Sequence, residues 1–524
     1  MAALEHNVVL KNPSRVEVRA AYIYPSTYEA MVSTLAHDLV YSVANSLDFV
    51  YLERFHARRL RGEEEPARSL ETGTPLKDFG LLLSSLHYEP DIVNLVRVLR
   101  ASGVEPRREL RRQVLVIGGP VAISNPIPFS GIADAFVIGE IEATLGRVLE
   151  IYAERQDDKR SFLEELASLD YIYVPGLKDG ARREYVRDLD SAPYPIAQIY
   201  NDEVEPAFGR GLKLEVSRGC PFRCSFCMET RLFQPYRRRS LGRLREIVER
   251  GLRHVPYRRI VIYALSFPAV ADDVRLLGEL ASAGLEASVP SIRLEKISGE
   301  LLELLGSLGQ RTLSLAPETF SPLLQRAYFK YPGMLDLVRE KVEEALGAGF
   351  NVKLYLLYGL RGSSLDEAKI NVEVLRGLSR VARRHGARLS VSLNPLVPKP
   401  RTPFQWIGME SPKRLRSELS FYVEELGGLV ESRPLDIRWA VVQAALAMAD
   451  RDLTDAIVLW AGAGGGLGGW RRALREASLD ISYVFRGHDA GRELPWEKVE
   501  VDPKERDVAR AQYEVVVRLL GFGP

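Results

Sequence analysis

The order of apolar and polar stretches along the first 155 residues predicts a doubly wound α/β domain. Apolar runs suited to buried parallel strands alternate with segments of helical periodicity. The expected strands are residues 16–24, 49–53, 80–86, 114–120 and 135–139, and the expected helices are residues 28–47, 91–101 and 142–153. In an open, Rossmann-like sheet of this kind the ligand site lies outside the carboxyl ends of the strands.

A second set of β/α units begins at Gly211. It follows a mixed segment, residues 156–210, that we expect to be a linker wrapping the next domain. The expected strands are residues 212–217, 259–265, 286–292, 312–316, 351–358 and 388–393. Six units over about 200 residues are too few for an eight-unit barrel, so residues 211–406 predict a partial, laterally open (β/α)6 TIM barrel. Residues 407–524 are expected to form a mainly helical domain, in which the glycine-rich run 462–469 is a turn rather than a phosphate loop.

The composition is that of a globular chain without a global charge. The 524 residues contain 71 Lys and Arg against 70 Asp and Glu, a net charge of +1. Such a chain has no overall positive field to hold nucleic acid or a membrane surface. No membrane span and no signal pattern is recognisable, which predicts a cytoplasmic protein. An excess of arginine over lysine, with little glutamine, favours a thermophilic source.

The three cysteines of the chain are Cys220, Cys224 and Cys227, all within eight residues that directly follow the first expected barrel strand. An odd count cannot form a disulfide framework. Three thiolates at these spacings can bind three irons of a cubane cluster and leave the fourth iron open to a ligand. A structural zinc site is the less favoured alternative, because it needs four ligands. No histidine lies near the cysteines in sequence, and the first one after them is His254.

Cys-x3-Cys-x2-Cys on the first strand of a partial barrel is the signature of the radical S-adenosylmethionine (SAM) superfamily, which this chain resembles. Within this superfamily, the chain looks like proteins that have an N-terminal domain of the B12-binding type and whose substrate is unassigned. The likeness spans nearly the whole chain. The matching segments are residues 24–29 (YPSTYE), 118–120 (GGP), 139–140 (GE), 215–240, 288–293 (SVPSIR), 315–320 (LAPETF), 352–360, 397–406 (VPKPRTPFQW), 448–453 (MADRDL) and 493–496 (ELPW).

The resemblance implies a [4Fe-4S] cluster on Cys220, Cys224 and Cys227, with SAM chelating the fourth iron. An electron from the cluster would cleave SAM into methionine and a 5'-deoxyadenosyl radical, so an electron donor of the ferredoxin or flavodoxin type is expected. The resemblance identifies neither the catalytic residues nor the substrate.

The N-terminal domain departs from the cobalamin-binding pattern that it resembles. Cobalamin domains with a histidine ligand use Asp-x-His-x-x-Gly after the first strand, where this chain reads YPSTYE. His37 lies inside the following expected helix and is expected to be a surface or packing residue. Cobalamin bound without a histidine lower ligand and an empty, vestigial domain are therefore equally compatible with the sequence. No cysteine is left over for an auxiliary iron–sulfur cluster.

Further candidate cofactor contacts lie near the carboxyl ends of expected strands. The resemblance favours SAM contacts for Glu318, Ser266 and two basic residues at helical i, i+4 spacing, Arg326 and Lys330. Each has a structural alternative: a helix N-terminal acid for Glu318, a turn residue for Ser266 and solvated charges for the basic pair.

Glycines are the remaining candidates for the cofactor sites. Gly359 would let backbone approach an adenine, and Gly118 and Gly119 would shape a ligand cavity, although a tight βα turn explains glycine equally well. The basic run YRRR, residues 236–239, is either a patch that steers an anionic substrate or a solvated helix start.

The leading interpretation is an enzyme that abstracts hydrogen, or transfers a methyl group if cobalamin binds. One alternative is a radical SAM enzyme that modifies an RNA base or a protein side chain. The other is a non-catalytic iron–sulfur electron carrier or scaffold, which has no use for a barrel cavity. For an enzyme, we expect the strand ends at residues 25–27 and 118–125 to face the barrel mouth near Cys220.

Overall fold

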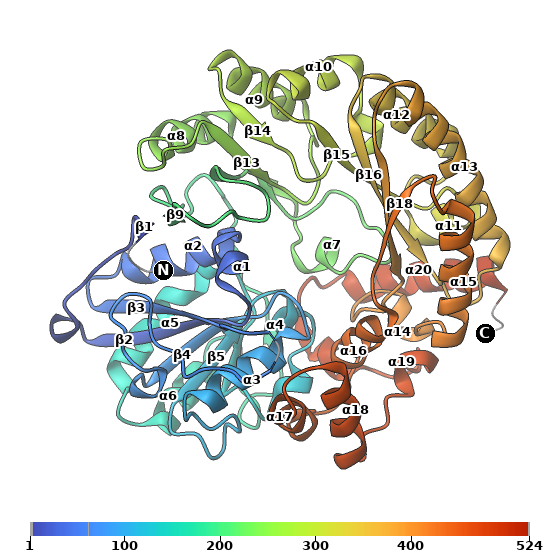
Figure 1. The fold of residues 1–524 in the computed structure, drawn as a ribbon. Helices are drawn as coiled ribbons and strands as arrows, with labels where there is room; N and C mark the ends of the chain where they lie inside the picture. Colours follow the sequence, from blue (N-terminus) through green and yellow to red (C-terminus); the bar gives the residue numbers. More distant parts are fainter. Residues whose placement is uncertain (1–3, 61, 522–524) are drawn as a thin grey trace.

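The computed structural model describes residues 4–60 and 62–521, and Figure 1 shows their arrangement. An N-terminal α/β domain (blue) lies beside a curved row of strands with helices along its outer side (green to orange). The C-terminal helices (red) lie against both. Within the described ranges, no helix is long and apolar enough to cross a membrane.

The N-terminal sheet has the strand order β3-β2-β4-β5-β6-β7. The five predicted strands are confirmed as parallel neighbours, and a short sixth strand pairs antiparallel at one edge. Their bounds are β2 (Val18–Tyr24), β3 (Val50–His56), β4 (Leu81–Ser85), β5 (Val114–Gly118), β6 (Ala135–Val137) and β7 (Ile172–Tyr173). From β2 the chain first goes to β3 on one side and then crosses to β4 on the other, which puts a topological switch point between β2 and β4.

Helices pack on both faces of this sheet. On one face lies α3 (Asp91–Ala101), and on the other lie α2 (Leu35–Asn45) and α5 (Ile141–Arg155). The single helix predicted at residues 28–47 is wrong, because α1 (Tyr28–Val32) ends before α2 begins. The hydroxyl of Thr34 accepts a hydrogen bond from the His37 amide and so caps α2.

The predicted linker, residues 156–210, belongs in part to the N-terminal domain. Its α6 (Lys159–Ala167) and β7 extend that domain, because Phe162 and Leu166 are buried in the same core as the sheet. Only the remainder wraps the molecule, with β8 (Ala181–Arg182) pairing with β19 (Val499–Glu500) and β9 (Tyr200–Asn201) with β1 (Glu5–His6).

All six predicted barrel strands are confirmed, and they run parallel. They are β10 (Leu212–Glu215), β13 (Arg259–Tyr263), β14 (Glu286–Ser288), β15 (Thr312–Glu318), β16 (Asn351–Tyr358) and β17 (Leu389–Pro395). A bridge between Ile292 and Leu315 joins the first three strands to the next three. A seventh strand, β18 (Glu431–Pro434), pairs with β17 beyond the predicted boundary at residue 406. Its sequence, ESRP, is polar and short, so no apolar pattern signalled it.

The outer layer of the barrel consists of helices that follow the strands. They are α8 (Leu241–Gly251), α9 (Ala271–Ser282), α10 (Gly299–Ser307), α11 (Pro322–Tyr328), α12 (Leu335–Gly347), α13 (Leu365–Arg384) and α15 (Pro412–Leu426).

The region after β18 is mainly helical, as predicted. It contains α16 (Ile437–Ala447), α17 (Thr454–Gly462), α18 (Leu467–Glu476), α19 (Tyr483–Arg486) and α20 (Glu505–Leu520). The glycine-rich run contains the turn between α17 and α18, where Gly464 and Gly465 adopt φ of +82° and +73°, and its last three residues begin α18.

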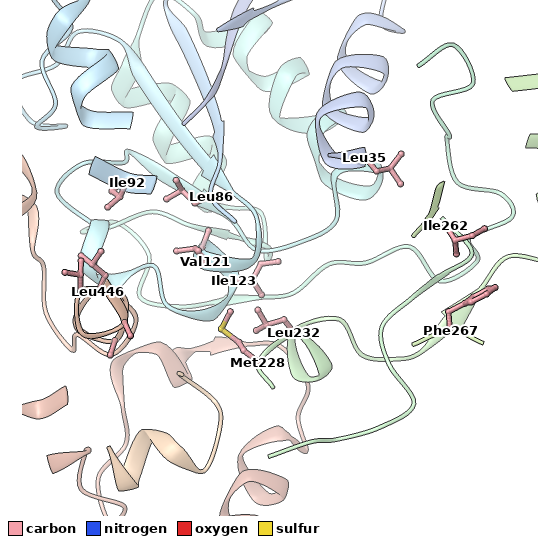
Figure 2. Close-up of a cluster of buried hydrophobic side chains, with 14 of the residues drawn as sticks. Leu35, Leu86, Ile92, Val121, Ile123, Met228, Leu232, Ile262, Phe267 and Leu446 are labelled. Atoms are coloured by element: carbon pink, nitrogen blue, oxygen red, sulfur yellow. The ribbon is translucent and has the colours of Figure 1, made fainter. Parts of the chain in front are cut away.

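One buried junction joins the three parts of the molecule, and Figure 2 shows its side chains. From the N-terminal domain come Val121 and Ile123 of α4 (Pro120–Ser124), which lie close to Met228 and to Leu232 of α7 (Glu229–Leu232) in the cysteine region. Asn125 ties the same corner to the C-terminal helices, since its side-chain amide donates to the carbonyls of Ala447 and Ala449 at 2.9 Å each. The region around the cysteines therefore packs on both other domains.

A buried charge network crosses the same boundary beside this junction. The Glu140 carboxylate accepts hydrogen bonds from Arg183, Arg218 and Arg237 at 2.6, 2.8 and 2.7 Å. Burial alone would raise the pKa of Glu140, but the three guanidinium groups outweigh it and lower that pKa to about 2. The network fixes the N-terminal domain against the start of the barrel.

The basic run at residues 236–239 is part of such networks, so both of its predicted roles are wrong. Arg237 binds Glu140, Arg238 binds Asp272 and Asp273, and Arg239 binds Glu215. Its first two arginines form β12 (Arg237–Arg238), which pairs with β11 (Ser217–Arg218), and do not begin a helix. With their charges paired inside the protein, these arginines do not steer a substrate.

We predict that Glu140→Gln lowers the free energy of unfolding by about 3–5 kcal/mol, because it leaves buried guanidinium groups without their shared carboxylate. Urea unfolding at neutral pH measures the change. The matched control is Glu150→Gln, whose partner Arg147 is exposed, so its loss should leave the free energy of unfolding nearly unchanged. Equal effects of the two substitutions would contradict the role given to Glu140.

This destabilisation should also depend on pH. The pKa of Glu140 in the folded protein, about 2, lies below its ordinary value of 4.5. The carboxylate therefore contributes its full stability above about pH 4.5 and loses it as the pH falls toward 2. The difference in unfolding free energy between wild type and Glu140→Gln should shrink over that interval, and a difference that stays constant in acid would be inconsistent with the network.

Candidate functional site

The cysteine loop lies at the carboxyl end of β10, where the barrel opens. Gly219 precedes it with φ of +81°, and a Cβ there would lie 2.4 Å from the carbonyl oxygen of Phe233, so the turn into the loop requires glycine. Ser225 fixes the middle of the loop to α11, donating from its amide to Tyr328 O at 2.9 Å and from its hydroxyl to Ala327 O at 2.7 Å. Cys220 is fixed through its carbonyl, which accepts from Gln234 at 2.8 Å.

The donor set of this loop fits an iron–sulfur cluster better than a zinc ion. In the described part of the chain, no three His, Cys, Asp or Glu side chains converge as ligands of one metal ion. A zinc ion needs its ligands around a single point, whereas the three cysteines of a cubane bind three different irons. Burial raises the pKa of all three thiols, to about 12 for Cys227, so thiolates here need a bound cation to balance them.

Two cationic side chains lie near the thiols. Lys330 binds Glu318 at 2.9 Å, and both side chains are about nine-tenths buried. Burial opposes the charge on Lys330, but the Glu318 carboxylate holds its pKa above the usual range. Arg293 stacks on the ring of Phe222, inside the cysteine loop, 3.5 Å from its centroid. Sequence reasoning missed Arg293, although its place after the third barrel strand was a signal for it.

Of the other predicted SAM contacts, Ser266 is buried and Arg326 is exposed. Ser266 follows β13 and is buried, with no hydrogen-bond partner for its hydroxyl among the described residues. Arg326 is exposed on α11. The helical i, i+4 spacing of Arg326 and Lys330 is wrong, because α11 ends at Tyr328 and the next residue, Phe329, is left-handed with φ of +51°.

Gly359 serves helix packing. Its φ is +71°, and a Cβ there would lie 2.1 Å from the Leu415 side chain of α15. This close approach gives Gly359 a packing role, and its approach to an adenine stays a prediction. The roles of Glu318, Ser266, Arg326 and Lys330 in SAM binding remain predictions.

A cavity of about 500 Å³ lies between the N-terminal domain and the barrel. One wall consists of the strand ends of β2, β4, β5 and β6 together with α2 and α5. The opposite wall includes residues 217–219, directly before Cys220, and residues 263–265 at the end of β13. Most lining side chains are apolar, among them Leu35, Leu39, Val40, Leu83, Val116, Ile123, Val137, Leu145, Val148, Phe233 and Leu265.

The predicted orientation of the N-terminal strand ends is confirmed for Gly118, Gly119 and Ile123, which line this cavity. The prediction is wrong for residues 25–27, which do not line the cavity. Near this strand end, the cavity is lined by Tyr22 of β2 and by Thr34, which follows the break between α1 and α2. A Cβ on Gly119 would lie 2.6 Å from the carbonyl oxygen of Leu86, so backbone packing within the domain explains that glycine. Gly118 has only Val137 within 4.0 Å of such a Cβ.

Two polar side chains in the cavity were missed by sequence reasoning. His87 follows β4, at the carboxyl edge where ligands bind, and it lines the cavity. The protein around the cavity desolvates the imidazole and lowers the pKa of His87 to about 4. Glu229 comes two residues after Cys227, and burial raises its pKa to about 7. His37, in contrast, is fully buried near Tyr22 and Tyr41, which confirms it as a packing residue.

Comparison with protein families identifies the class to which this fold and loop belong. Residues 36–175 match the family model of radical SAM proteins, N-terminal, and residues 214–374 match that of the radical SAM superfamily. Together the two models match more than half of the chain. The chain belongs to the radical SAM superfamily and is an enzyme of that class, whose cofactors are a [4Fe-4S] cluster and SAM.

Two archaeal relatives are similar to this chain. An uncharacterized protein of Methanocaldococcus jannaschii is 28% identical over 387 residues, which cover 74% of this chain and 78% of the relative. An uncharacterized protein of Methanopyrus kandleri is 28% identical over 308 residues, covering 50% of this chain and 57% of the relative.

Solved structures of TsrM, a radical SAM methyltransferase from Kitasatospora setae, share the fold. The one with tryptophan and a SAM analogue has a TM-score of 0.52 at 13% identity, covering 88% of this chain and 99% of TsrM. The one with cobalamin and a [4Fe-4S] cluster has a TM-score of 0.50 at 14% identity and the same coverage. The likeness places this chain among α/β proteins of the TsrM fold.

We predict that Cys220→Ala, Cys224→Ala and Cys227→Ala each abolish SAM cleavage and leave the circular dichroism spectrum close to that of wild type. Each thiol is expected to bind a different iron, while the loop contributes little to the barrel core. Ser282→Ala, on the outer surface of α9, is the control and should keep both iron and activity. A cysteine variant with full iron and full activity would rule out the three-ligand site.

Proposed function

We propose that this protein reductively cleaves SAM at the cluster to form a 5'-deoxyadenosyl radical that acts on a ligand in the cavity between the N-terminal domain and the barrel. The observation that carries this proposal is the shared wall: residues 217–219 line the cavity and lead directly into Cys220. A radical acts only on an atom within contact distance, so a cavity that starts at the cluster loop is a suitable place for its target.

The side chains near the thiols suit the polar groups of SAM. Lys330 and Arg293 can pair with its carboxylate. Glu318 can accept hydrogen bonds from its ammonium group or its ribose, and the unpartnered hydroxyl of Ser266 is available for the methionine end. We propose that an external ferredoxin or flavodoxin type of protein delivers the electron.

The N-terminal side of the cavity supports cobalamin as the second cofactor. Domain interiors are close-packed, so an apolar space between the sheet and helices α2 and α5 marks a ligand site. Its aliphatic walls, including Leu39, Val116 and Val148, suit a flat heteroaromatic group such as the nucleotide tail of cobalamin. Bound there, cobalamin would supply methyl transfer, and the TsrM structure with both cofactors supports this form of the proposal.

Two observations weigh against the alternatives. An electron carrier or scaffold has no use for a large cavity beside its cluster. The basic run at residues 236–239 was the feature that favoured RNA as a substrate. Its arginines are paired with carboxylates within the protein, which weighs against that alternative.

The proposal is tested by the cofactor content and products of anaerobically purified, full-length protein. Iron, sulfide and cobalt are quantified, and the protein is then incubated with SAM and a reductant. We expect 5'-deoxyadenosine, or S-adenosylhomocysteine if methyl transfer operates. A protein with a complete cluster that forms neither product would contradict the proposal.

We further predict that Gly118→Leu abolishes cobalamin binding and leaves the fold intact. Residue 118 shares its strand face with Val116, so a leucine there projects into the cavity, and no neighbour lies close enough to a Cβ to clash. Gly278→Leu, on α9 and away from the cavity, is the control, since its Cβ also meets nothing within 4 Å. Equal cobalt content in the two variants would show that the ligand binds elsewhere.

Cobalamin bound in this way is expected to have no histidine lower ligand. His87 is the histidine that lines the cavity, which makes it the residue to test. The Co(II) paramagnetic resonance spectrum should be unchanged when protein histidines carry nitrogen-15 and when His87 is replaced by glutamine. A nitrogen splitting that responds to the label and disappears in His87→Gln would reject this expectation.

A further inference from the structure

The C-terminal helix α20 reaches the cysteine loop from the other end of the chain. Arg223 lies between the first two cysteines, and Arg231 lies just after the third. One carboxylate binds both: Glu505 Oε2 accepts from Arg223 at 2.9 Å, and Glu505 Oε1 accepts from Arg231. Arg223 and Glu505 are 282 residues apart in sequence, so this is a tertiary clamp across the loop.

Neighbours of Glu505 bind the same two arginines. Gln512, two turns further along α20, accepts from the Arg231 side chain and donates to the Arg223 carbonyl at 2.8 Å. Asp502 accepts from Arg223 at 3.1 Å. The clamp therefore holds both the backbone and the side chains of the loop.

An apolar cluster also links α20 to the loop. Val516 is fully buried in a cluster that includes Tyr328 and Phe404, and Phe226 packs against that cluster. Phe226 lies between Cys224 and Cys227. Helix α20 thus contacts the loop region at Arg223, between the first two cysteines, and at Arg231, beyond the last one, and it shares an apolar cluster with Phe226 in the second interval.

The buried charge of Arg231 is balanced by the carboxylate of Glu505. Arg231 is fully buried, and Glu505 is its ion-pair partner in the described structure. A buried charge that loses its partner is strongly unfavourable, and a loop relieves such a cost by moving more easily than a packed strand does. Loss of the Glu505 charge would therefore act on the loop that carries the cluster ligands.

We propose that Glu505 is a positioning residue for the cluster: through Arg223 and Arg231 it holds the cysteine loop in the conformation that binds iron. The C-terminal helix then determines how firmly the cluster is retained and which environment its irons experience. This inference rests on the cluster and does not depend on cobalamin or on the substrate.

The test compares full-length wild type with Glu505→Gln after anaerobic cluster reconstitution. Partners outside the ligand sphere of a metal typically change its affinity by about 10–100-fold, so we expect the variant to lose iron to a chelator at least about tenfold faster. The spectrum of the reduced cluster in paramagnetic resonance should also shift. Loss of global stability alone would not change that spectrum.

Two matched controls separate positioning from general destabilisation. Asp134→Asn breaks a buried ion pair with Arg111 in the N-terminal domain, far from the loop in sequence, and should destabilise the protein while leaving cluster spectrum and chelator rate unchanged. Glu514→Gln removes an exposed carboxylate from α20 itself and should change nothing.

The result that overturns the inference is a Glu505→Gln protein with the iron content, chelator rate and cluster spectrum of wild type. An effect no larger than that of Asp134→Asn would overturn it equally. If Glu505→Gln does not fold, Arg223→Gln provides the same test, since this arginine is about one-third exposed and its replacement leaves Arg231 paired.

Discussion

The structure depends on how one short loop without a core of its own is held in place. Three cysteines within eight residues cannot bury enough apolar surface to fix themselves. Their positions come from the elements around them: Gly219 makes the turn out of the first barrel strand, Ser225 ties the loop to α11, and Glu505 holds it from the C-terminal helix. The geometry of the cluster site therefore depends on tertiary contacts with distant parts of the chain.

The same loop faces the N-terminal domain, which explains the concentration of buried charge and apolar packing at that boundary. Val121 and Ile123 pack near Met228 and Leu232, while Glu140 joins three arginines from the wrapping segment and the barrel. These contacts fix the carboxyl ends of two parallel sheets opposite each other. In both architectures ligands bind at those ends, so the cavity follows from the way in which the domains are joined.

The sequence predicts the strands of this fold well, because buried parallel strands are apolar runs bounded by turns. It fails where an element is short and polar, as for β18, or where pairing depends on distant partners. The arginines at residues 237–239 have no local signal for their carboxylates, which come from other parts of the chain. The cysteines are recognisable from spacing alone. His87 and Arg293 follow strands, and that place in the sequence was a signal for both. Glu505 becomes visible only when the chain is folded, because its role arises from proximity to the loop.

The claim central to this account is that the cluster and the ligand of the N-terminal domain share one cavity. The most direct measurement is the paramagnetic resonance spectrum of protein that holds both a reduced [4Fe-4S] cluster and Co(II) cobalamin. The account predicts two interacting spins, with signals split or broadened relative to protein that contains either centre alone. A spectrum equal to the sum of two independent signals would contradict it.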